Sequence, residues 1–435
     1  MRTYFTCVFF LASALISDAQ TVRQDVRLRA SHPDGIYEKG DTVRVWADVS
    51  SVPGDSLFLN MYRYCTWEPV TTTALSLKVG ENLLFEKAFN ESAQYVFEVT
   101  NGSDPREFKK GGDGNSFSGV VISPQDFRPG FEMPADFDRF WNREIRKMRR
   151  HRMKPSLTNL SEGEEYTTYH VEIGCSGPAP VRAYVAYPAG AQKGSLPIII
   201  NFHAAGNPGS ASKASAAVKA ARNIPGGALA MDINAHGMAD DQLPHYYDSL
   251  AAGPLKDYAK REPDGKLADY HFKWMMLRAI RALDYMCRNP LWDGRRVIVM
   301  GTSQGGYQSA FLAGMDERVT AAVLTVPAGL DQGAPLQGRP ASWPATMKLY
   351  PESTCRNIPY IDPAAFLRRT KAEIWCEIGL YDYTCPAANL FGTMNTVNSP
   401  KVIVTSQRPH SSYFTTDKEH AKKSREEFFR HLSEK

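Results

Sequence analysis

Ser303 stands in the hexapeptide GTSQGG, residues 301–306, directly after the apolar run RVIVM and directly before the helix-like stretch YQSAFLAGM. Small residues on both sides of a serine permit a sharp strand-to-helix turn that exposes the hydroxyl at the carboxyl end of a sheet. A hydroxyl held in this way is typical of a nucleophile in acyl transfer, whereas a plain tight turn is the alternative for the same residues. The strand-like run before Ser303 and the helix-like stretch after it favour the nucleophile.

The nucleophile requires a base that follows it in the chain. A serine hydroxyl attacks well when a neighbouring imidazole accepts its proton, and for a serine on such a turn the acid comes next and the histidine last. The histidines downstream of Ser303 are His410, His420 and His431. His420 and His431 lie in a charged stretch that indicates a solvated terminal helix, whereas His410 follows the strand-like run KVIVTS. His410 is therefore the predicted base.

The predicted acid is Asp382, which stands where the apolar run EIWCEIG leads into LYDYTCP. A carboxylate there would accept the Nδ1 proton of His410, fix the tautomer of the ring and stabilise the imidazolium. Glu377 and Asp362 are weaker candidates, because Glu377 lies inside the strand-like run and Asp362 precedes a proline well upstream.

Acyl transfer also requires donors for the oxyanion. In this arrangement they are the backbone N–H of the residue after the nucleophile, Gln304, and a backbone N–H from the loop after an earlier strand. The stretch NFHAAGNPG, residues 201–209, is that loop, and the N–H of Ala204 or Ala205 is the predicted second donor. His203 in the same loop is predicted to support it by hydrogen bonding.

A second polar stretch, MDINAHGMADDQLPHYYD at residues 231–248, is the alternative site for chemistry, through a metal ion. Its spacing matches no metal-ligand motif, and loops after sheet strands are rich in such residues. The serine mechanism needs neither a metal nor an organic cofactor, and none is predicted.

The elements that must position these residues follow two patterns along the 435 residues. Residues 20–122 contain short β-rich runs separated by turn clusters such as HPDG and EKGD, which predicts a β-sandwich domain. Residues 123–134 are a proline-punctuated linker. Residues 135–435 alternate strand-like runs, most of them continuously apolar, with helix-like stretches, which predicts a catalytic domain built on a doubly wound, mostly parallel α/β sheet.

That second domain is predicted to open with a helix, because ADFDRFWNREIRKM places five apolar side chains on one stripe at helical spacing. They are Phe137, Phe140, Trp141, Ile145 and Met148.

Residues 1–19 combine a basic residue at Arg2, an apolar run and small residues, as a signal peptide cleaved before Gln20 does. No segment approaches the roughly 20 apolar residues that a membrane span needs. The sequence therefore predicts a secreted or periplasmic protein without a membrane span. Of its seven cysteines, Cys7 lies in the signal peptide, and the sequence leaves open whether the other six are thiols or disulfides. The net charge of +4 is spread along the chain and predicts no nucleic-acid binding.

Four stretches together resemble the acetyl xylan esterases and cephalosporin C deacetylases of carbohydrate esterase family seven, which belong to the α/β-hydrolases. They are GTSQGG after a strand, EIGLYDYTCPAANLF, the single histidine of the last loop, and the opening sequence MPADFDRFW. The resemblance covers about Pro124 to Lys435, and it implies a triad at Ser303, Asp382 and His410.

The chain departs from that family at several positions. It reads Asn234-Ala235-His236 where the family usually has an RGQ motif, Ala205 where the oxyanion loop has a tyrosine, and Ser411 where a glutamate usually follows the histidine. The β-sandwich and the signal peptide are additions to the usual single-domain enzyme. The family often forms hexamers, and an extra domain could block or replace those contacts, so whether the chain forms a homo-oligomer stays open.

The sequence thus predicts a secreted serine esterase that removes O-acetyl groups from polysaccharide or oligosaccharide, with an acetylated carbohydrate as its partner. The motifs alone supply acyl transfer, and the resemblance supplies the acetyl group. The alternatives are a general carboxylesterase, a serine peptidase on the same fold, and a glycan-binding protein with a degenerate hydrolase core.

Polar side chains in the proline-rich segment 327–363 are expected to suit sugar hydroxyls better than acyl tails. They are Gln332, Gln337, Arg339, Ser342, Glu352 and Arg356.

Overall fold

The computed structural model describes residues 25–435, apart from residues 53, 55, 67, 103–115, 208, 264–266, 268, 269 and 411–417. The expected signal peptide, residues 1–19, lies outside the described residues. Within the described ranges, no helix is both long and apolar enough to cross a bilayer.

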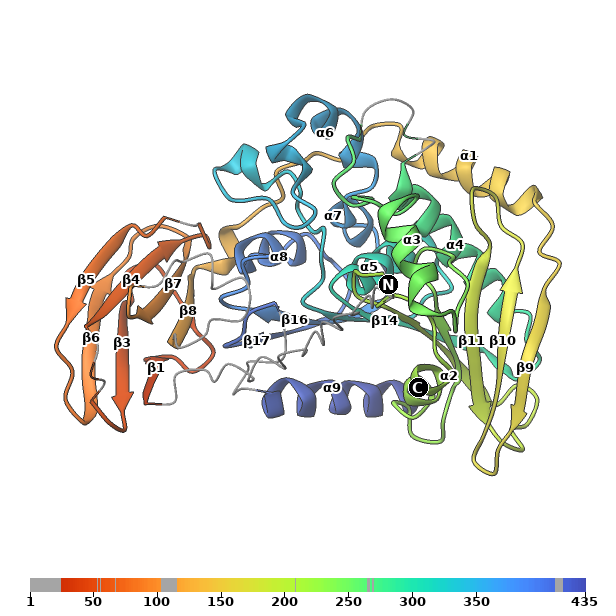
Figure 1. Ribbon diagram of the computed structural model, residues 1–435, viewed down its shortest axis with the longest axis horizontal. Coiled ribbons are helices and arrows are strands. Elements are labelled where there is room, and N and C mark those ends of the chain that lie inside the picture. Colours follow the sequence, from red (N-terminus) through yellow and green to blue (C-terminus); the bar gives the residue numbers. More distant parts are fainter. Residues whose placement is uncertain are drawn as a thin grey trace, which may run out of the picture.

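Two sheets, antiparallel except where β2 pairs with β8, make up the first part of the described chain (Figure 1). The three-stranded sheet has the order β1 (Val26–Ala30), β3 (Thr42–Val49), β6 (Gly80–Ala88). The five-stranded sheet has the order β2 (Ile36–Tyr37), β8 (Ser116–Ile122), β7 (Ala93–Thr100), β4 (Leu57–Arg63), β5 (Thr71–Leu75).

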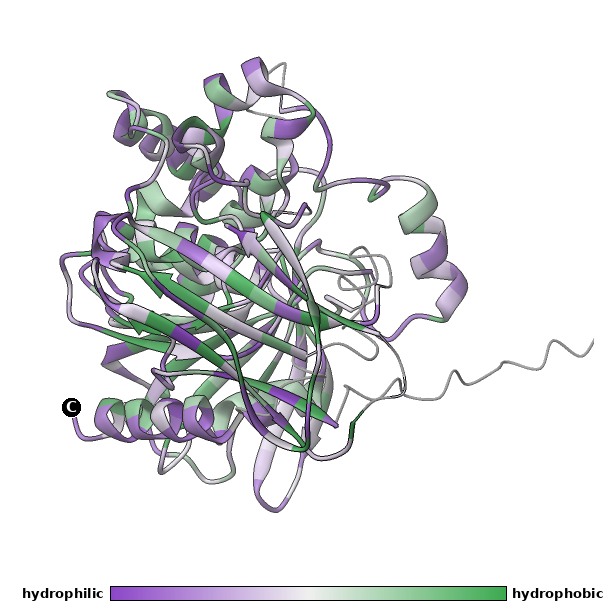
Figure 2. Ribbon diagram, turned by 90° about the vertical axis from the view of Figure 1, so that its left-hand side faces the viewer, coloured by the Kyte–Doolittle hydropathy of each residue, from purple (hydrophilic) through white to green (hydrophobic). Residues whose placement is uncertain are grey.

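The two sheets pack face to face as a β-sandwich. Alternate residues of β3, such as Val43 and Val45, are buried in one cluster with Leu59 of β4 and Phe97 of β7. Figure 2 shows apolar and polar residues interspersed along these strands, as expected where one face of a sheet is buried and the other is solvated. A single core between two sheets differs from a propeller, in which separate blades repeat around an axis.

A nine-stranded sheet forms the centre of the rest of the chain. Its order is β17 (Lys401–Ser406), β16 (Glu373–Gly379), β15 (Ala321–Thr325), β14 (Trp292–Thr302), β12 (Leu196–Phe202), β13 (Leu229–Ile233), β11 (Val181–Pro188), β10 (Tyr166–Ile173), β9 (Ser156–Glu162). The strands from β17 to β13 in this order pair in parallel, and β11, β10 and β9 pair antiparallel. The predicted doubly wound, mostly parallel α/β sheet is confirmed.

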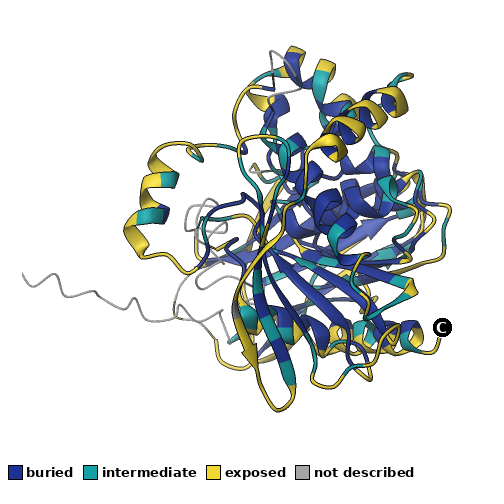
Figure 3. Cartoon of the chain, turned by 90° about the vertical axis from the view of Figure 1, so that its right-hand side faces the viewer, coloured by how far each residue is buried: buried dark blue, intermediate teal, exposed yellow. Residues whose placement is uncertain are grey.

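Helices cover both faces of this sheet, and its inner strands, such as β12, β15 and β16, are buried along most of their length (Figure 3). One face shares its core with α1 (Phe137–Arg150), α4 (His271–Met286), α5 (Gln304–Met315), α7 (Pro363–Leu367) and α8 (Ala387–Met394). The other face packs on α2 (Ala214–Ala221) and α9 (Lys418–Ser433). The other α-helices in the described part of the chain are α3 (Pro244–Ala252) and α6 (Pro351–Asn357).

The segment predicted to be a linker, residues 123–134, is packed against the α/β part. The N–H of Gly130 donates to Asp331 at 2.7 Å, and the side-chain amide of Asn395 donates to the carbonyls of Pro124 and Phe127 at 2.7 and 3.1 Å. These bonds fix how the chain leaves the β-sandwich.

The helix α1 follows this segment and packs into the core. The five apolar residues predicted to form one stripe are all buried in α1, and Trp141 is completely inaccessible. Its ring packs on Phe311 and Phe366, and its Nε1 donates to the carbonyl of Tyr360 at 2.8 Å.

Trp141→Ala is expected to lower the free energy of unfolding by about 3–5 kcal/mol, because it leaves a large cavity and an unpaired carbonyl. Urea unfolding followed by circular dichroism measures the change. Arg150→Ala, at the exposed end of the same helix, is the control and should change stability by less than about 0.5 kcal/mol. Equal stability of the two variants would contradict this packing.

Candidate active site

Ser303 lies at the turn between β14 and α5 with φ of 55° and ψ of −118°. A residue other than glycine rarely adopts a positive φ, so the turn depends on its surroundings. The N–H of Ser303 donates to the carbonyl of Thr325 at 3.0 Å, and the Ser303 carbonyl accepts from the N–H of Ala328 at 2.9 Å. These bonds tie the strained residue to β15 and to the segment after it.

The glycines on either side of Ser303 are required by close packing of backbone on backbone. A Cβ on Gly301 would lie 2.3 Å from the carbonyl carbon of Gly305, and a Cβ on Gly305 would lie 2.1 Å from the carbonyl oxygen of Phe202. Real Cβ atoms do not approach this closely. Gly305 of the motif is therefore required where the start of α5 contacts the end of β12.

The structure brings Ser303, Asp382 and His410 together at the carboxyl ends of three parallel strands, β14, β16 and β17. His410 Nε2 lies 2.8 Å from Ser303 Oγ, and His410 Nδ1 lies 2.7 Å from Asp382 Oδ2. Asp382 is fully buried, and its Oδ1 accepts the N–H groups of Thr384 and Cys385, both at 2.8 Å. A fixed carboxylate at Nδ1 holds the proton there and leaves Nε2 as the acceptor for the serine hydroxyl.

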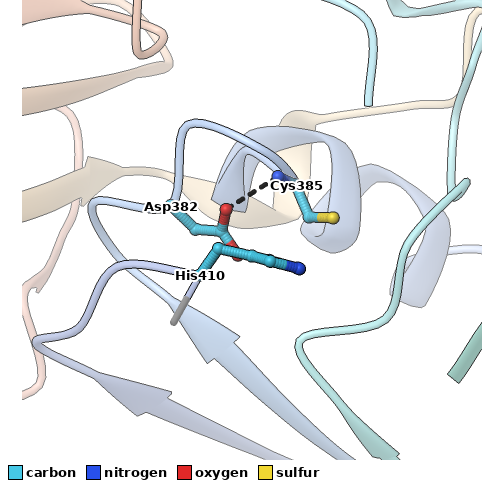
Figure 4. A group of neighbouring side chains, drawn as sticks. All are labelled: Asp382, Cys385 and His410. Carbon is cyan, nitrogen blue, oxygen red and sulfur yellow. Dashed lines mark hydrogen bonds and ion pairs between the residues drawn. The ribbon is translucent and has the colours of Figure 1, made fainter. Parts of the chain in front are cut away.

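Asp382, Cys385 and His410 are also the one group in the described part of the chain with atoms spaced as metal ligands are, within 4.8 Å of one another. Figure 4 shows Asp382 between His410 and the turn of Cys385, which donates its N–H to the carboxylate. Burial and the charge of Asp382 raise the pKa of the Cys385 thiol well above its usual range, and a thiol must lose its proton to bind a metal. Because both Asp382 oxygens already accept hydrogen bonds, the group is better arranged for proton transfer than for metal binding.

The two weaker candidates for the acid have other partners. Glu377 accepts from Arg408 at 3.0 Å, and Arg408 in turn donates to the carbonyl of His410 at 3.0 Å, so this buried ion pair supports the histidine loop. Asp362 begins α7 by accepting the N–H of Ala364 at 2.9 Å, and burial raises its pKa to about 7.

The predicted oxyanion residues lie on adjacent segments. Gln304 is fully buried in the first turn of α5, whereas Ala204 and Ala205 are exposed in the loop that follows β12. That loop begins at Phe202, whose carbonyl lies against Gly305. His203 Nε2 lies 2.8 Å from the buried carboxylate of Asp232, which matches its predicted supporting role.

Asp232 and Asp240 from the alternative polar stretch serve the loops around them. Asp232 also accepts from the side chain of Asn201 at 2.6 Å and from the N–H of Lys213 at 2.8 Å. Asp240 accepts the N–H and the hydroxyl of Ser212 at 2.7 and 2.6 Å. Protein donors thus occupy the two carboxylates that lie deepest.

The expectation for the proline-rich segment is wrong for three residues, because Gln332, Arg339 and Ser342 are buried. Arg339 pairs with Asp331 at 2.9 Å and donates to the carbonyl of Ala388 at 3.0 Å. A polar side chain that finds its partners inside the fold does not face a substrate, and one sequence cannot distinguish the two cases. Gln337, Glu352 and Arg356 are exposed.

Sequence reasoning missed Tyr258, whose hydroxyl donates to Oε1 of Gln304 at 2.5 Å. Its ring lies 4.5 Å from that of His236 and 4.9 Å from that of His271, and His236 Nδ1 lies 3.0 Å from His271 Nε2. No motif marks this cluster, because Tyr258 and His271 lie far from Gln304 in the sequence. The sequence marked His236 as part of the alternative polar stretch 231–248 and as a departure from the RGQ motif.

Part of this chain is similar in sequence to known esterases. Residues 123–331 match the family model of acetyl xylan esterase (AXE1), a range that contains Ser303 but ends before Asp382 and His410. Acetyl esterase Axe7A of Xylanibacter ruminicola is 26% identical over 294 residues, which are 65% of this chain and 64% of that protein. The chain therefore spans about 64% of the length of this curated relative.

Solved structures of acetyl xylan esterases share the fold. The enzyme from Paenibacillus sp. R4 has 22% identity and a TM-score of 0.58 over 70% of this chain and 97% of its own. Acetyl xylan esterase 1 from Thermoanaerobacterium sp. JW/SL YS485 has 21% identity and a TM-score of 0.56 over 71% and 97%. These matches confirm the α/β-hydrolase fold and the resemblance that the sequence motifs indicated.

The cluster of Tyr258, His236 and His271 beside Gln304 predicts that the folded protein is less stable at acid pH. Burial, followed by the positive charge of Arg278, lowers the pKa of His236 to about 3, against about 6.5 in an unfolded chain. Between these values the unfolded chain binds a proton that the folded chain does not, so stability falls as the pH falls through this window.

His236→Gln removes that titration and should reduce the loss of unfolding free energy between pH 7 and pH 4.5 by on the order of 2 kcal/mol. Urea unfolding at the two pH values measures the loss in the variant and in the parent. His245→Gln, at an exposed position of α3, is the matched control. An unchanged loss in His236→Gln would show that His236 is not buried in its neutral form.

Proposed function

Since residues 123–331 match the acetyl xylan esterase family, we propose that the protein is a serine esterase that removes O-acetyl groups from polysaccharide or oligosaccharide. The observation that carries the proposal is the chain of hydrogen bonds from Ser303 through His410 to Asp382, at 2.8 and 2.7 Å. Both distances are already short enough for proton transfer without rearrangement.

The first half of the reaction acylates Ser303. His410 Nε2 accepts the hydroxyl proton while Ser303 Oγ attacks the carbonyl carbon of the acetyl ester. The N–H of Gln304 and that of Ala204 or Ala205 receive the negative charge on the carbonyl oxygen. The bond to the sugar oxygen then breaks, His410 gives that oxygen the proton, and the acetyl group stays on Ser303.

The second half releases the acetyl group. His410 accepts a proton from water, whose oxygen attacks the acetyl carbon, and the bond to Ser303 Oγ breaks as that oxygen regains a proton. Acetate leaves, and the resting site is restored. Asp382 stabilises the imidazolium in both halves, and no cofactor takes part.

The site of action is part of the proposal. The pattern of residues 1–19 supports export to the periplasm or the medium. In the described part of the chain all six cysteines are free, so the fold does not depend on disulfides in that compartment.

Substitutions in the triad test the mechanism. Ser303→Ala and His410→Ala should each lower kcat for p-nitrophenyl acetate by several orders of magnitude, and the double variant should lose little more, because the residues act as a unit. Asp382→Asn should lose somewhat less. His420→Ala, in the exposed part of α9, is the control and should keep parental turnover. Near-parental turnover by Ser303→Ala would remove the nucleophile from this mechanism.

The length of the acyl chain separates an acetyl esterase from a general carboxylesterase. Each buried methylene is worth about 0.8 kcal/mol to a pocket that accepts it, whereas a pocket closed around an acetyl group rejects it by overpacking. We expect kcat/KM for p-nitrophenyl acetate to exceed that for the butyrate at least about tenfold, or roughly 1.4 kcal/mol. Acetylated xylo-oligosaccharides should release acetate. Equal use of butyrate, with no acetate from any acetylated glycan, would leave a serine hydrolase but not a carbohydrate deacetylase.

A further inference from the structure

The β-sandwich contacts the two loops that carry Asp382 and His410. In Figure 1, β7 and β8 lie on the side of the sandwich that faces β16, β17 and α8. Two glutamine side chains, one from each side of the interface, make hydrogen bonds across it. Each glutamine binds backbone groups of the opposite partner.

Gln94 of β7 spans the loop of the acid. It is fully buried, its Nε2 donates to the carbonyl of Leu380 at 3.1 Å, and its Oε1 accepts the N–H of Ala388 at 3.0 Å. Leu380 stands two residues before Asp382, and Ala388 stands six residues after it. One amide from the sandwich therefore pairs with both ends of the segment that holds the acid.

Gln407 fixes the loop of the base in the same manner. Its Nε2 donates to the carbonyl of Gly119 in β8 at 2.9 Å, and its Oε1 accepts the N–H of the same glycine at 2.8 Å. Gln407 directly follows β17 and stands three residues before His410. A Cβ on Gly119 would lie 2.4 Å from the carbonyl oxygen of Leu380, so this strand also touches the acid loop directly.

Aromatic packing surrounds the acid from the same side. Tyr381 stacks on Phe117 of β8 with ring centroids 5.5 Å apart, and Tyr383 meets Tyr62 of β4 edge to face at 6.2 Å. Both chain neighbours of Asp382 thus pack on the sandwich. A loop is ordinarily among the most mobile parts of a fold, and these contacts remove that freedom.

From these contacts we infer that Gln94 and Gln407 are positioning residues through which the β-sandwich sets the distance between Asp382 and His410. The inference rests on the proposed function. It gives the sandwich a part in catalysis, because the two amides tie the acid loop and the base loop to the same sheet. A misplacement of about 1 Å in a reacting group can cost about 100-fold in rate.

Gln94→Met and Gln407→Met keep the length of each side chain and remove its amide. Each variant should lower kcat for p-nitrophenyl acetate about 10- to 100-fold and leave KM within about threefold, because the acyl site itself is untouched. Gln125→Met, at an exposed position of the segment between the two parts, is the matched control. Val45→Ala weakens the sandwich core away from the interface, and at temperatures where it stays folded it should keep parental kcat.

A second measurement separates positioning from general damage. If Gln94 acts through the acid, then adding Gln94→Met to Asp382→Asn should lower kcat by less than about threefold further, whereas independent effects would multiply. The same comparison applies to Gln407→Met, which keeps the test in force if Gln94→Met fails to fold. Folded fractions from circular dichroism normalise every rate.

The outcomes are distinguishable. Parental kcat in Gln94→Met and Gln407→Met, with activity abolished in Ser303→Ala, overturns the positioning role and leaves the proposed function in place. Multiplicative losses in the Asp382→Asn background, or an equal loss in Val45→Ala, also overturn it. Parental activity in Ser303→Ala overturns the proposed function, and the positioning role with it.

Discussion

The strained backbone of Ser303 is the constraint on which the arrangement of the site depends. A positive φ at a serine costs about 1–3 kcal/mol and persists only where the surroundings leave no alternative. Here two backbone hydrogen bonds, to Thr325 and from Ala328, hold the residue in place, while Gly301 and Gly305 let α5 approach β12. The turn aims the hydroxyl out of the carboxyl edge of the sheet, at the position to which His410 is brought.

Near Ser303, the buried carboxylates of Asp382 and Glu377 have hydrogen-bond partners within the protein. Asp382 takes two backbone donors and one imidazole, and Glu377 takes Arg408, which also binds the carbonyl of His410. An unpaired buried charge would destabilise the fold strongly, so each of these partners has to be present for the loops to fold as they do. The result is an acid and a base that are held before any substrate arrives, which is what fast proton transfer requires.

The β-sandwich adds hydrogen bonds to these loops from across an interface. A nine-stranded sheet positions its own loops only at their strand ends, and the segment from Leu380 to Ala388 continues beyond them. Gln94 pairs the two ends of that segment as a neighbouring strand would, and Gln407 returns the same kind of bond to β8. The added sheets at this edge therefore supply hydrogen-bond partners to the two loops that carry Asp382 and His410.

The sequence by itself determined the elements and the chemistry they carry. Continuous apolar runs such as LPIIINF and AAVLTV had to be buried on both faces. Ser303, Asp382 and His410 each follow a strand-like run, and parallel pairing of those strands brings the three residues to one edge of the sheet. Tertiary structure alone decided which polar side chains serve the fold. Arg339 and Ser342 were expected to face sugar hydroxyls and are buried instead, and Gln94, Tyr258 and Gln407 carry no motif. The physical reason is that local patterns encode strands, helices and turns, whereas a side-chain hydrogen bond between residues 94 and 380 depends on how two sheets far apart in the sequence pack against each other.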